Sequence, residues 1–85
     1  MIYRVYSVFD SKVNAYMTPH FRRSKGEILR EFSDVVNNKS DNGIYLHPED
    51  FFLYELGSFD DNTGVLVMHA NIESLGCALE FKKHD

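Results

Sequence analysis

The sequence predicts a small α+β domain: an antiparallel sheet of three to four strands, covered on one face by one main helix and a short C-terminal helix. Three observations predict this class. Two runs are rich in β-branched and aromatic residues, an apolar stripe with helical spacing lies between them, and a hairpin-turn signal follows the second run. A chain of 85 residues forms one domain, residues 1–85, and its 44% hydrophobic content is that of a globular protein.

The first expected element is a strand from Ile2 to Phe9. Both of its faces are largely apolar, which is typical of a strand inside a sheet. Asp10, Ser11 and Lys12 then indicate a turn, and Val13 to Met17 fits a short return strand that would complete a hairpin. Pro19 has no backbone donor, so any strand beyond it is confined to a sheet edge.

The main helix is expected to begin after Ser24 and to run to about Asn37. Ser24 and Glu27 have the spacing of a capping box, in which the serine hydroxyl accepts the Glu27 amide and the carboxylate reaches back. Five apolar residues then fall on one helical face: Ile28, Leu29, Phe32, Val35 and Val36. This element is the most strongly specified one in the sequence.

A polar loop is expected from Asn37 to Gly43, followed by an extended segment from Ile44 to Leu46. Pro48 breaks that segment, because the residue before a proline is biased away from the helix. Phe51 to Leu56 predicts the second strong strand.

The last third of the chain predicts a hairpin and a short helix. Asp60 to Gly64 has turn chemistry, and Val65 to His69 would be the returning strand. Asn71 would cap a helix in which Ile72, Leu75 and Leu79 share a face. Lys82 to Asp85 is expected to be a frayed tail.

Composition narrows the class of protein. Cys77 is the only cysteine, so an internal disulfide and a cysteine-based zinc site are excluded, as is typical of a reducing cytoplasm. No apolar run approaches the ~20 residues of a membrane span, and the first residues lack a signal-peptide pattern. We therefore expect a soluble cytoplasmic protein with no membrane partner.

Candidate catalytic and metal-binding patterns are weak. The acids from Asp60 to Gly64 fail the spacing of a calcium loop, and His47, Glu49 and Asp50 fit a turn better than a metal site. Cys77 lies among apolar residues, where a free cysteine is usually inert. All five glycines are isolated, so there is no phosphate-binding glycine loop. We expect no enzyme activity, no metal and no cofactor.

Charge is distributed unevenly along the chain. Residues 1–30 hold six basic side chains against two acidic ones, whereas residues 31–85 hold three against eleven. Basic groups interleaved with aromatic rings suit single-stranded nucleic acid, whose phosphates attract cations and whose bases stack on rings. The candidate nucleic-acid-binding residues are Lys12, Tyr16, His20, Phe21, Arg22, Arg23, Lys25 and Arg30. Of these, Tyr16, His20 or Phe21 would stack bases, and the cations would contact phosphates.

Two alternatives remain open. The basic residues fit a solvated helix entrance with Arg30 paired to Asp34, and the net charge of −4 opposes nonspecific binding to nucleic acid. In that case the chain would be a protein-interaction module that uses an exposed sheet face or its acidic residues: Glu49, Asp50, Asp60, Asp61 and Glu73.

Four sequence blocks carry a resemblance to a known family. They are Val5-Tyr6-Ser7-Val8-Phe9-Asp10-Ser11-Lys12; Gly26-Glu27-Ile28-Leu29-Arg30 with Phe32-Ser33-Asp34-Val35-Val36-Asn37; His47-Pro48-Glu49-Asp50-Phe51 with Leu53-Tyr54 and Leu56-Gly57; and Phe59-Asp60-Asp61-Asn62-Thr63-Gly64. In this order and spacing, over most of residues 3–67, the chain resembles the small nonstructural protein of gokushoviruses. These are single-stranded DNA microviruses that are similar to the chlamydia phages.

The resemblance implies a phage protein that binds DNA in the bacterial host cytoplasm. Its implied role lies in single-stranded genome synthesis, or in the switch from duplex replication to packaging. Single-stranded DNA is the expected ligand, and a phage or host replication protein is a further expected partner. A homodimer formed through an uncovered sheet face is also expected, since small sheets leave apolar faces and edges exposed.

Overall fold

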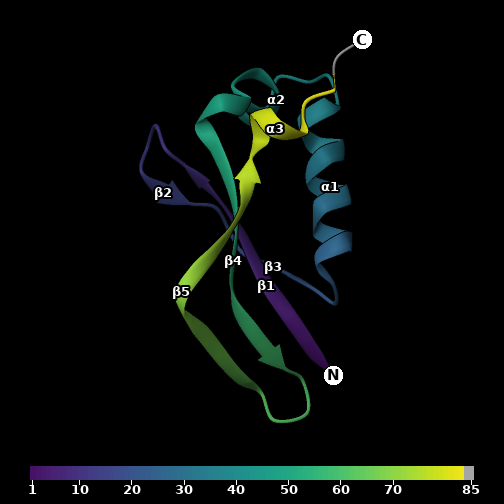
Figure 1. Cartoon of the computed structure of the whole chain (residues 1–85), viewed down its shortest axis with the longest axis vertical. Coiled ribbons are helices and arrows are strands. Elements are labelled where there is room, and N and C mark those ends of the chain that lie inside the picture. The colour runs from purple at the N-terminus through teal and green to yellow at the C-terminus, as the bar shows by residue number, and fades with distance from the viewer. Residues whose placement is uncertain (84–85) are drawn as a thin grey trace.

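An antiparallel sheet is built around strand β1 (Ile2–Asp10), as the computed structural model of residues 1–83 shows (Figure 1). The strand order is β2-β1-β4-β5, and β3 pairs with β1 beside β2. The other strands are β2 (Ala15–Tyr16), β3 (His20–Arg22), β4 (Phe51–Asp60) and β5 (Val65–Cys77). With one main helix and short helices on one side, the predicted α+β class is confirmed.

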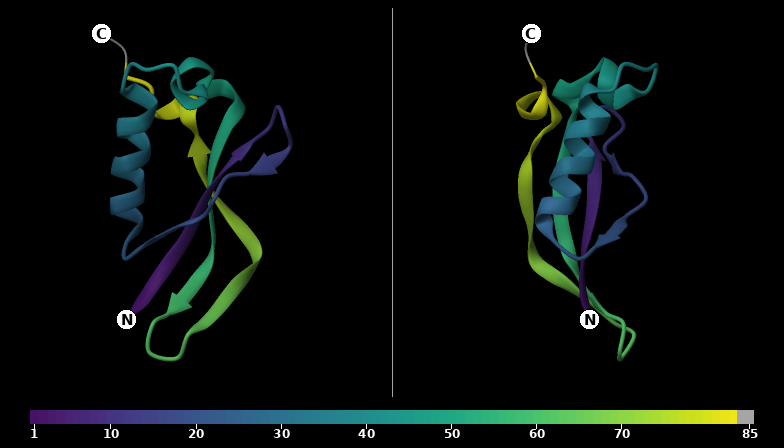
Figure 2. Two further views of the ribbon diagram at one scale, coloured as in Figure 1. Left: turned by 180° about the vertical axis from the view of Figure 1, so that it is seen from behind. Right: turned by 90° about the vertical axis from the view of Figure 1, so that its right-hand side faces the viewer.

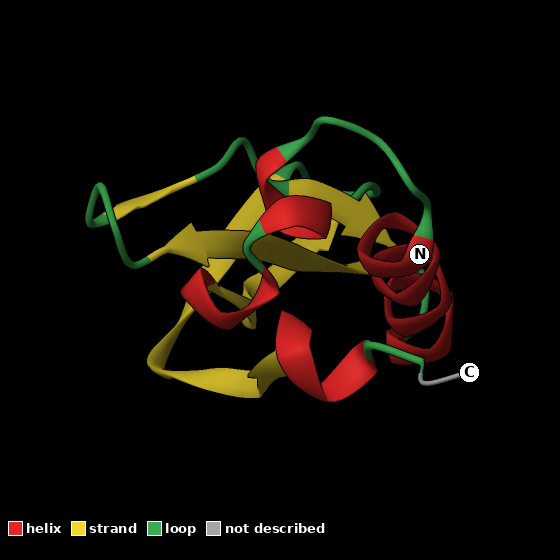
Figure 3. Ribbon diagram, turned by 90° about the horizontal axis from the view of Figure 1, so that it is seen from above, coloured by secondary structure: helices red, strands yellow, loops and turns green. Residues whose placement is uncertain are grey.

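The main helix, α1 (Lys25–Asn37), covers one face of this sheet (Figures 2 and 3). Its cap is the predicted one: the Ser24 hydroxyl accepts from the Glu27 amide at 3.4 Å, and also meets the Glu27 carboxylate. Three stripe residues, Ile28, Phe32 and Val36, are buried. Leu29 packs at the margin of the core, but Val35 is exposed, so the predicted stripe is too wide by that residue.

The core lies between α1 and the sheet. Tyr6 and Val8 of β1 and Phe51 and Leu53 of β4 point toward the helix, because residues two apart on a strand share a face. Ile44 and Ala78 close the upper end of this core. Figure 2 (right) shows α1 in front of the strands that carry these residues.

The segment Ile44–Leu46 is helical, so the expected extended conformation there is wrong. It belongs to α2 (Gly43–Leu46), because the Asn42 carboxamide oxygen accepts from the amides of Ile44 and Tyr45 at 2.8 and 3.2 Å. This local cap decides the conformation. A 3₁₀ turn, η1 (Pro48–Asp50), then leads into β4.

The expected helix from Asn71 is also wrong, because the chain stays extended there and pairs with β4. Glu73 and Ser74 lie opposite Glu55 and Tyr54, and four residues of β5, 69–72, bulge opposite the single residue Leu56. The short C-terminal helix is α3 (Ala78–Phe81), seven residues later than Asn71.

The end of the described chain is held in place. The amide of Lys83 donates to Asn37 Oδ1 at 2.8 Å, and the Lys82 ammonium lies 4.0 Å from the centre of the Tyr45 ring. The expected fraying is therefore wrong for these two lysines, while residues 84–85 lie outside the described residues.

The molecule is elongated, with extents of 44 × 25 × 19 Å. The β4–β5 hairpin projects past the beginning of α1, and Figure 1 shows its turn at the bottom of the view. We call residues 57–68, which form this end of the hairpin, the arm. In the described part of the chain, no helix has the length and apolar character needed to cross a membrane.

Candidate nucleic-acid interface

The sheet face opposite α1 carries a set of aromatic rings. Tyr6 and Val8 point toward the helix, so the residues between and beside them point to the other side. Cross-strand partners share a face, and this rule adds rings from the neighbouring strands. We call this side the open face, and its aromatic residues are Tyr3, Phe9, Tyr16, Phe21, Phe52, Tyr54 and Phe59.

Two ring clusters stand on the open face. Tyr16 pairs with Phe9, and its ring lies 4.8 Å from the Phe9 ring and 6.0 Å from that of Tyr54. Phe21 meets Phe59 edge to face at 5.7 Å. Tyr16 and Phe21 are 48% and 42% exposed, so both rings retain surface on which a ligand can stack.

The Phe21 cluster borders a shallow hollow at the arm. Its lining is mostly apolar and comprises Tyr3, Phe21, Phe59, Asp61, Gly64 and Leu66. Leu66 lies opposite Phe59 in the β4–β5 pairing and therefore belongs to the open face.

Two other members of the predicted cluster, His20 and Arg22, lie on the α1 side of the sheet. His20 pairs with Tyr6, and Arg22 pairs with Arg4, both of which point toward the helix side. His20 is exposed there, but it does not join the rings of the open face.

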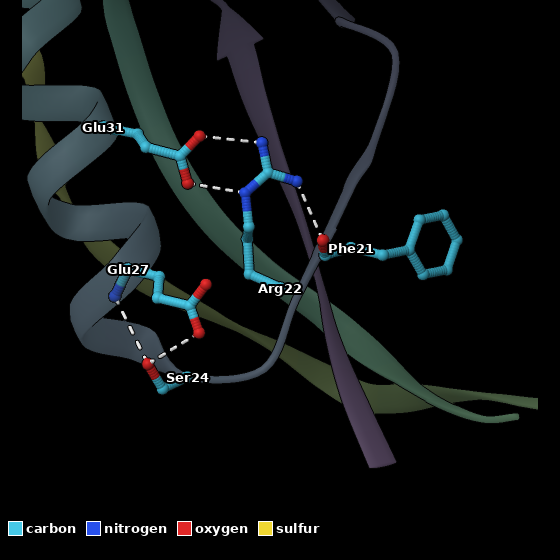
Figure 4. A network of polar contacts seen from close by, with 5 residues as sticks. All are labelled: Phe21, Arg22, Ser24, Glu27 and Glu31. Atoms are coloured by element: carbon cyan, nitrogen blue, oxygen red, sulfur yellow. Dashed lines mark hydrogen bonds and ion pairs between the residues drawn. The ribbon is translucent and has the colours of Figure 1, made fainter. Parts of the chain in front are cut away.

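Arg22 is engaged by a carboxylate (Figure 4). Its guanidinium donates to both Glu31 oxygens, from Nε at 2.5 Å and from Nη2 at 2.8 Å, and a third bond goes to the Phe21 carbonyl oxygen. This bidentate bond holds the pKa of the Glu31 carboxyl below its ordinary value and raises the pKa of Arg22. The Glu31 carboxylate thus largely neutralises the positive charge of Arg22.

The other predicted cations differ in whether they form ion pairs. Lys25 forms an ion pair with Glu73 at 3.2 Å. Among the described residues, Lys12, Arg23 and Arg30 are exposed and form no ion pair, so the alternative pairing of Arg30 with Asp34 is not formed. Lys12 lies in the turn after β1, at the opposite end of that strand from Arg23 (Figure 1).

The acidic residues proposed as one binding side are dispersed. Glu49 and Asp50 belong to η1 at one end of the molecule, and Asp60 and Asp61 lie at the hairpin turn at the other (Figure 1). Asp61 accepts from the Met1 ammonium at 2.7 Å, and Glu73 is paired with Lys25. These five carboxylates do not form one surface.

His47, Glu49 and Asp50 come closer together than their sequence suggests. Their ligand atoms lie within 4.8 Å of one another, although His47 and Glu49 are exposed. Such groups are common without an ion, so the turn remains our interpretation. Cys77 is half-buried with its thiol 3.4 Å from the Pro48 carbonyl oxygen, in keeping with a structural role.

Sequence reasoning missed a buried polar cluster on the helix side. Glu55 is 6% exposed and its carboxylate lies 2.8 Å from His69 Nε2. The Tyr6 hydroxyl beside it is fully buried and has no hydrogen-bond partner among the described residues. Burial, together with the Glu55 carboxylate, raises the pKa of Tyr6 to about 12. Sequence reasoning also missed Tyr54 and Phe59, because only the register of β4 with β1 puts these rings on the open face.

Comparison with known proteins gives one match. The model of the family described as "Phage ORF5 protein" matches residues 3–81. No curated protein and no solved structure matches the chain.

Proposed function

Since this chain belongs to the Phage ORF5 protein family, we propose that it is a non-enzymatic accessory protein that binds single-stranded DNA. It would act in the cytoplasm of the infected bacterium, during genome synthesis or packaging of a gokushovirus-like microvirus. The observation that carries the proposal is the pair of half-exposed rings, Tyr16 and Phe21, on the open face of the sheet.

These two rings lie along one edge of the molecule. Their partners on β1, Phe9 and Val5, are four residues apart, which places the rings about 13 Å apart along the strand at ~3.3 Å per residue. The Tyr54 ring packs against Tyr16 with 6.0 Å between the ring centres, and the Phe59 ring packs against Phe21 with 5.7 Å between the ring centres. A single strand laid along this edge would meet both rings in succession, and stacking accepts any base.

Two cations stand at the ends of the same edge. Lys12 precedes the first ring and Arg23 follows the second, and neither forms an ion pair in the described part of the chain. Arg22 and Lys25 are engaged by Glu31 and Glu73, so phosphate contacts are expected mainly from the unpaired cations. The net charge of −4 then limits binding to low and moderate salt.

The test is fluorescence anisotropy with a labelled oligodeoxythymidylate. Tyr16→Leu and Phe21→Leu are each expected to weaken binding about 5- to 150-fold, the equivalent of one stacked base. Tyr45→Leu is the matched control, because it removes a ring on α2 and is expected to leave affinity unchanged. An oligonucleotide that does not bind at low salt, or that binds both ring variants as tightly as the wild type, refutes the proposal.

The phosphate contacts are tested by salt dependence. Lys12→Gln and Arg23→Gln should each flatten the plot of log affinity against log salt by about 0.7 per lost contact. Lys39→Gln, in the loop after α1, is the control with the same change in charge. Equal slopes for all three variants would argue against a defined path for the phosphates.

A second candidate function, protein interaction, is favoured by a different observation: the exposed apolar residues of the arm. The dispersed acids offer no such surface.

A further inference from the structure

The outer strand of the arm, β5, begins with an unusually apolar run. Four consecutive residues, Val65, Leu66, Val67 and Met68, are each 52–54% exposed. Leu66 and Met68 lie on the open face, opposite Phe59 and Gly57, so Val65 and Val67 point to the other side. An exposed edge strand is ordinarily blunted by charge or proline, and these four residues of β5 include neither.

The same segment has a free backbone edge. In the described part of the chain β5 pairs with β4 alone, so the amide and carbonyl groups on its outer side have no strand partner. On the helix side of the arm, Ile2 adds another apolar residue, 50% exposed. Both faces and the edge of the arm are therefore suited to burial.

The exposed area exceeds that of an ordinary monomer. A compact chain of 9.9 kDa exposes about 5,200 Å², whereas this chain exposes 5595 Å². Its radius of gyration, 13.4 Å, compares with about 12 Å for a compact domain of this length. The surplus of about 400 Å² is half of the ~800 Å² that each partner buries in a standard interface.

We propose that the arm is a homodimer interface, in which Val65–Met68 of β5 pairs antiparallel with the same segment of a second copy. The symmetry of antiparallel pairing fixes the arrangement. Paired residues share a face and the two-fold axis is perpendicular to the sheet, so the register is centred on a residue, Leu66 or Val67.

Charge is compatible with a second copy as the occupant in the register centred on Leu66. With the centre on Leu66, Val65 pairs with Val67 and Asp61 faces Asn71; with the centre on Val67, Leu66 pairs with Met68. The register centred on Leu66 places no carboxylate opposite another between residues 59 and 73, whereas the register centred on Val67 places Asp61 opposite Glu73. Because each chain has a net charge of −4, the register centred on Leu66 is the favoured one.

This pairing replaces the sheet-face dimer expected from the sequence by an edge dimer. The open faces of the two copies would lie on the same side of one continuous sheet, so the rings of both would be presented together. The inference does not depend on DNA binding and is tested without DNA.

The test is sedimentation equilibrium of the full chain from micromolar to millimolar concentration. The wild type is expected to dimerise, and Val67→Lys to remain monomeric over the range in which the wild type dimerises. Leu79→Lys is the matched control, since Leu79 is 51% exposed on α3 and carries the same change in charge. Circular dichroism shows whether each variant is folded.

Disulfide trapping gives a second readout that does not require loss of binding. In a Cys77→Ser background, Leu66→Cys or Val67→Cys should form a linked dimer on mild oxidation, because self-paired residues bring their Cα atoms within ~5.5 Å. Leu79→Cys should not. A wild type that is monomeric throughout, a dimeric Val67→Lys, or equal linking of Leu79→Cys overturns the proposal. Each of these outcomes leaves the anisotropy results for single-stranded DNA unaffected.

Discussion

Replacement of Gly57 by alanine should destabilise the molecule more than any other single methyl addition at a glycine. A Cβ at this position would lie 2.2 Å from the Val67 carbonyl oxygen and 2.9 Å from Met68 Cα. Both are backbone atoms of the neighbouring strand, so no side chain can rotate away and β5 itself must move. Gly57 pairs with Met68, the last residue of β5 before the bulge.

The magnitude follows from two contributions. Overpacking of this kind costs about 1–3 kcal/mol, and each ladder hydrogen bond lost when the strands separate costs about 1 kcal/mol. We therefore expect Gly57→Ala to lower the free energy of unfolding by about 3 kcal/mol, a large part of the ~4–13 kcal/mol typical of a domain of this size.

Urea denaturation followed by circular dichroism measures this change. At an m-value of about 1 kcal/mol per molar, the midpoint should fall by ~3 M or the variant should be unfolded without urea. Gly26→Ala is the matched control: outside its own helix backbone and its chain neighbours, the nearest atom to the added Cβ would be Ser24 Oγ at 3.9 Å, and alanine in a helix gains up to about 1 kcal/mol over glycine. A Gly57→Ala midpoint equal to that of the wild type would refute the close approach of the two strands.

Three further predictions concern polar groups. Tyr6→Phe should be neutral or stabilising at pH 7, because the buried hydroxyl has no hydrogen-bond partner within residues 1–83. Burial also raises the pKa of Tyr6 to about 12, so the wild type should lose stability between pH 10 and 12 as the unfolded chain ionises, and the variant should lose less. Thermal melts at pH 7 to 11 compare the two. Arg22→Gln should cost at most about 1 kcal/mol at neutral pH; since the pKa of Glu31 is lowered by Arg22, this difference should vanish as urea midpoints are measured at progressively lower pH. Asn37→Ala removes bonds to the Phe81 carbonyl oxygen and the Lys83 amide and should cost about 2 kcal/mol in urea denaturation; a wild-type midpoint would show that the end of the chain is not anchored there.

The parts of the fold predicted correctly from the sequence are those specified by local chemistry. The Ser24 cap, the stripe of Ile28, Phe32 and Val36, and the turn after Asp60 each depend on residues close in sequence, and the structure contains all three. The extended segment expected at Ile44 is wrong because the Asn42 side chain caps a helical turn there. The helix expected at Asn71 is wrong because pairing with β4 overrides its apolar spacing.

The sequence predicted which kinds of residue form the candidate site, but not which face of the sheet each of them occupies. Sequence proximity grouped Tyr16, His20 and Phe21, but alternation along the strands sends His20 to the helix side and the two rings to the open face. The ion pair between Arg22 of β3 and Glu31 of α1 links residues nine apart in different elements, so no local pattern in the sequence predicts it. Tyr54 and Phe59 reach the site only through the register of β4 with β1.

The bulge of residues 69–72 separates β5 into two halves that keep their register with β4 independently. Because these four residues stand opposite one, the chain can be lengthened or shortened after Ala70 without displacing any core residue. Natural variation in length among related phage proteins is expected to concentrate there, where it would change the reach and angle of the hairpin while the body of the domain stays constant.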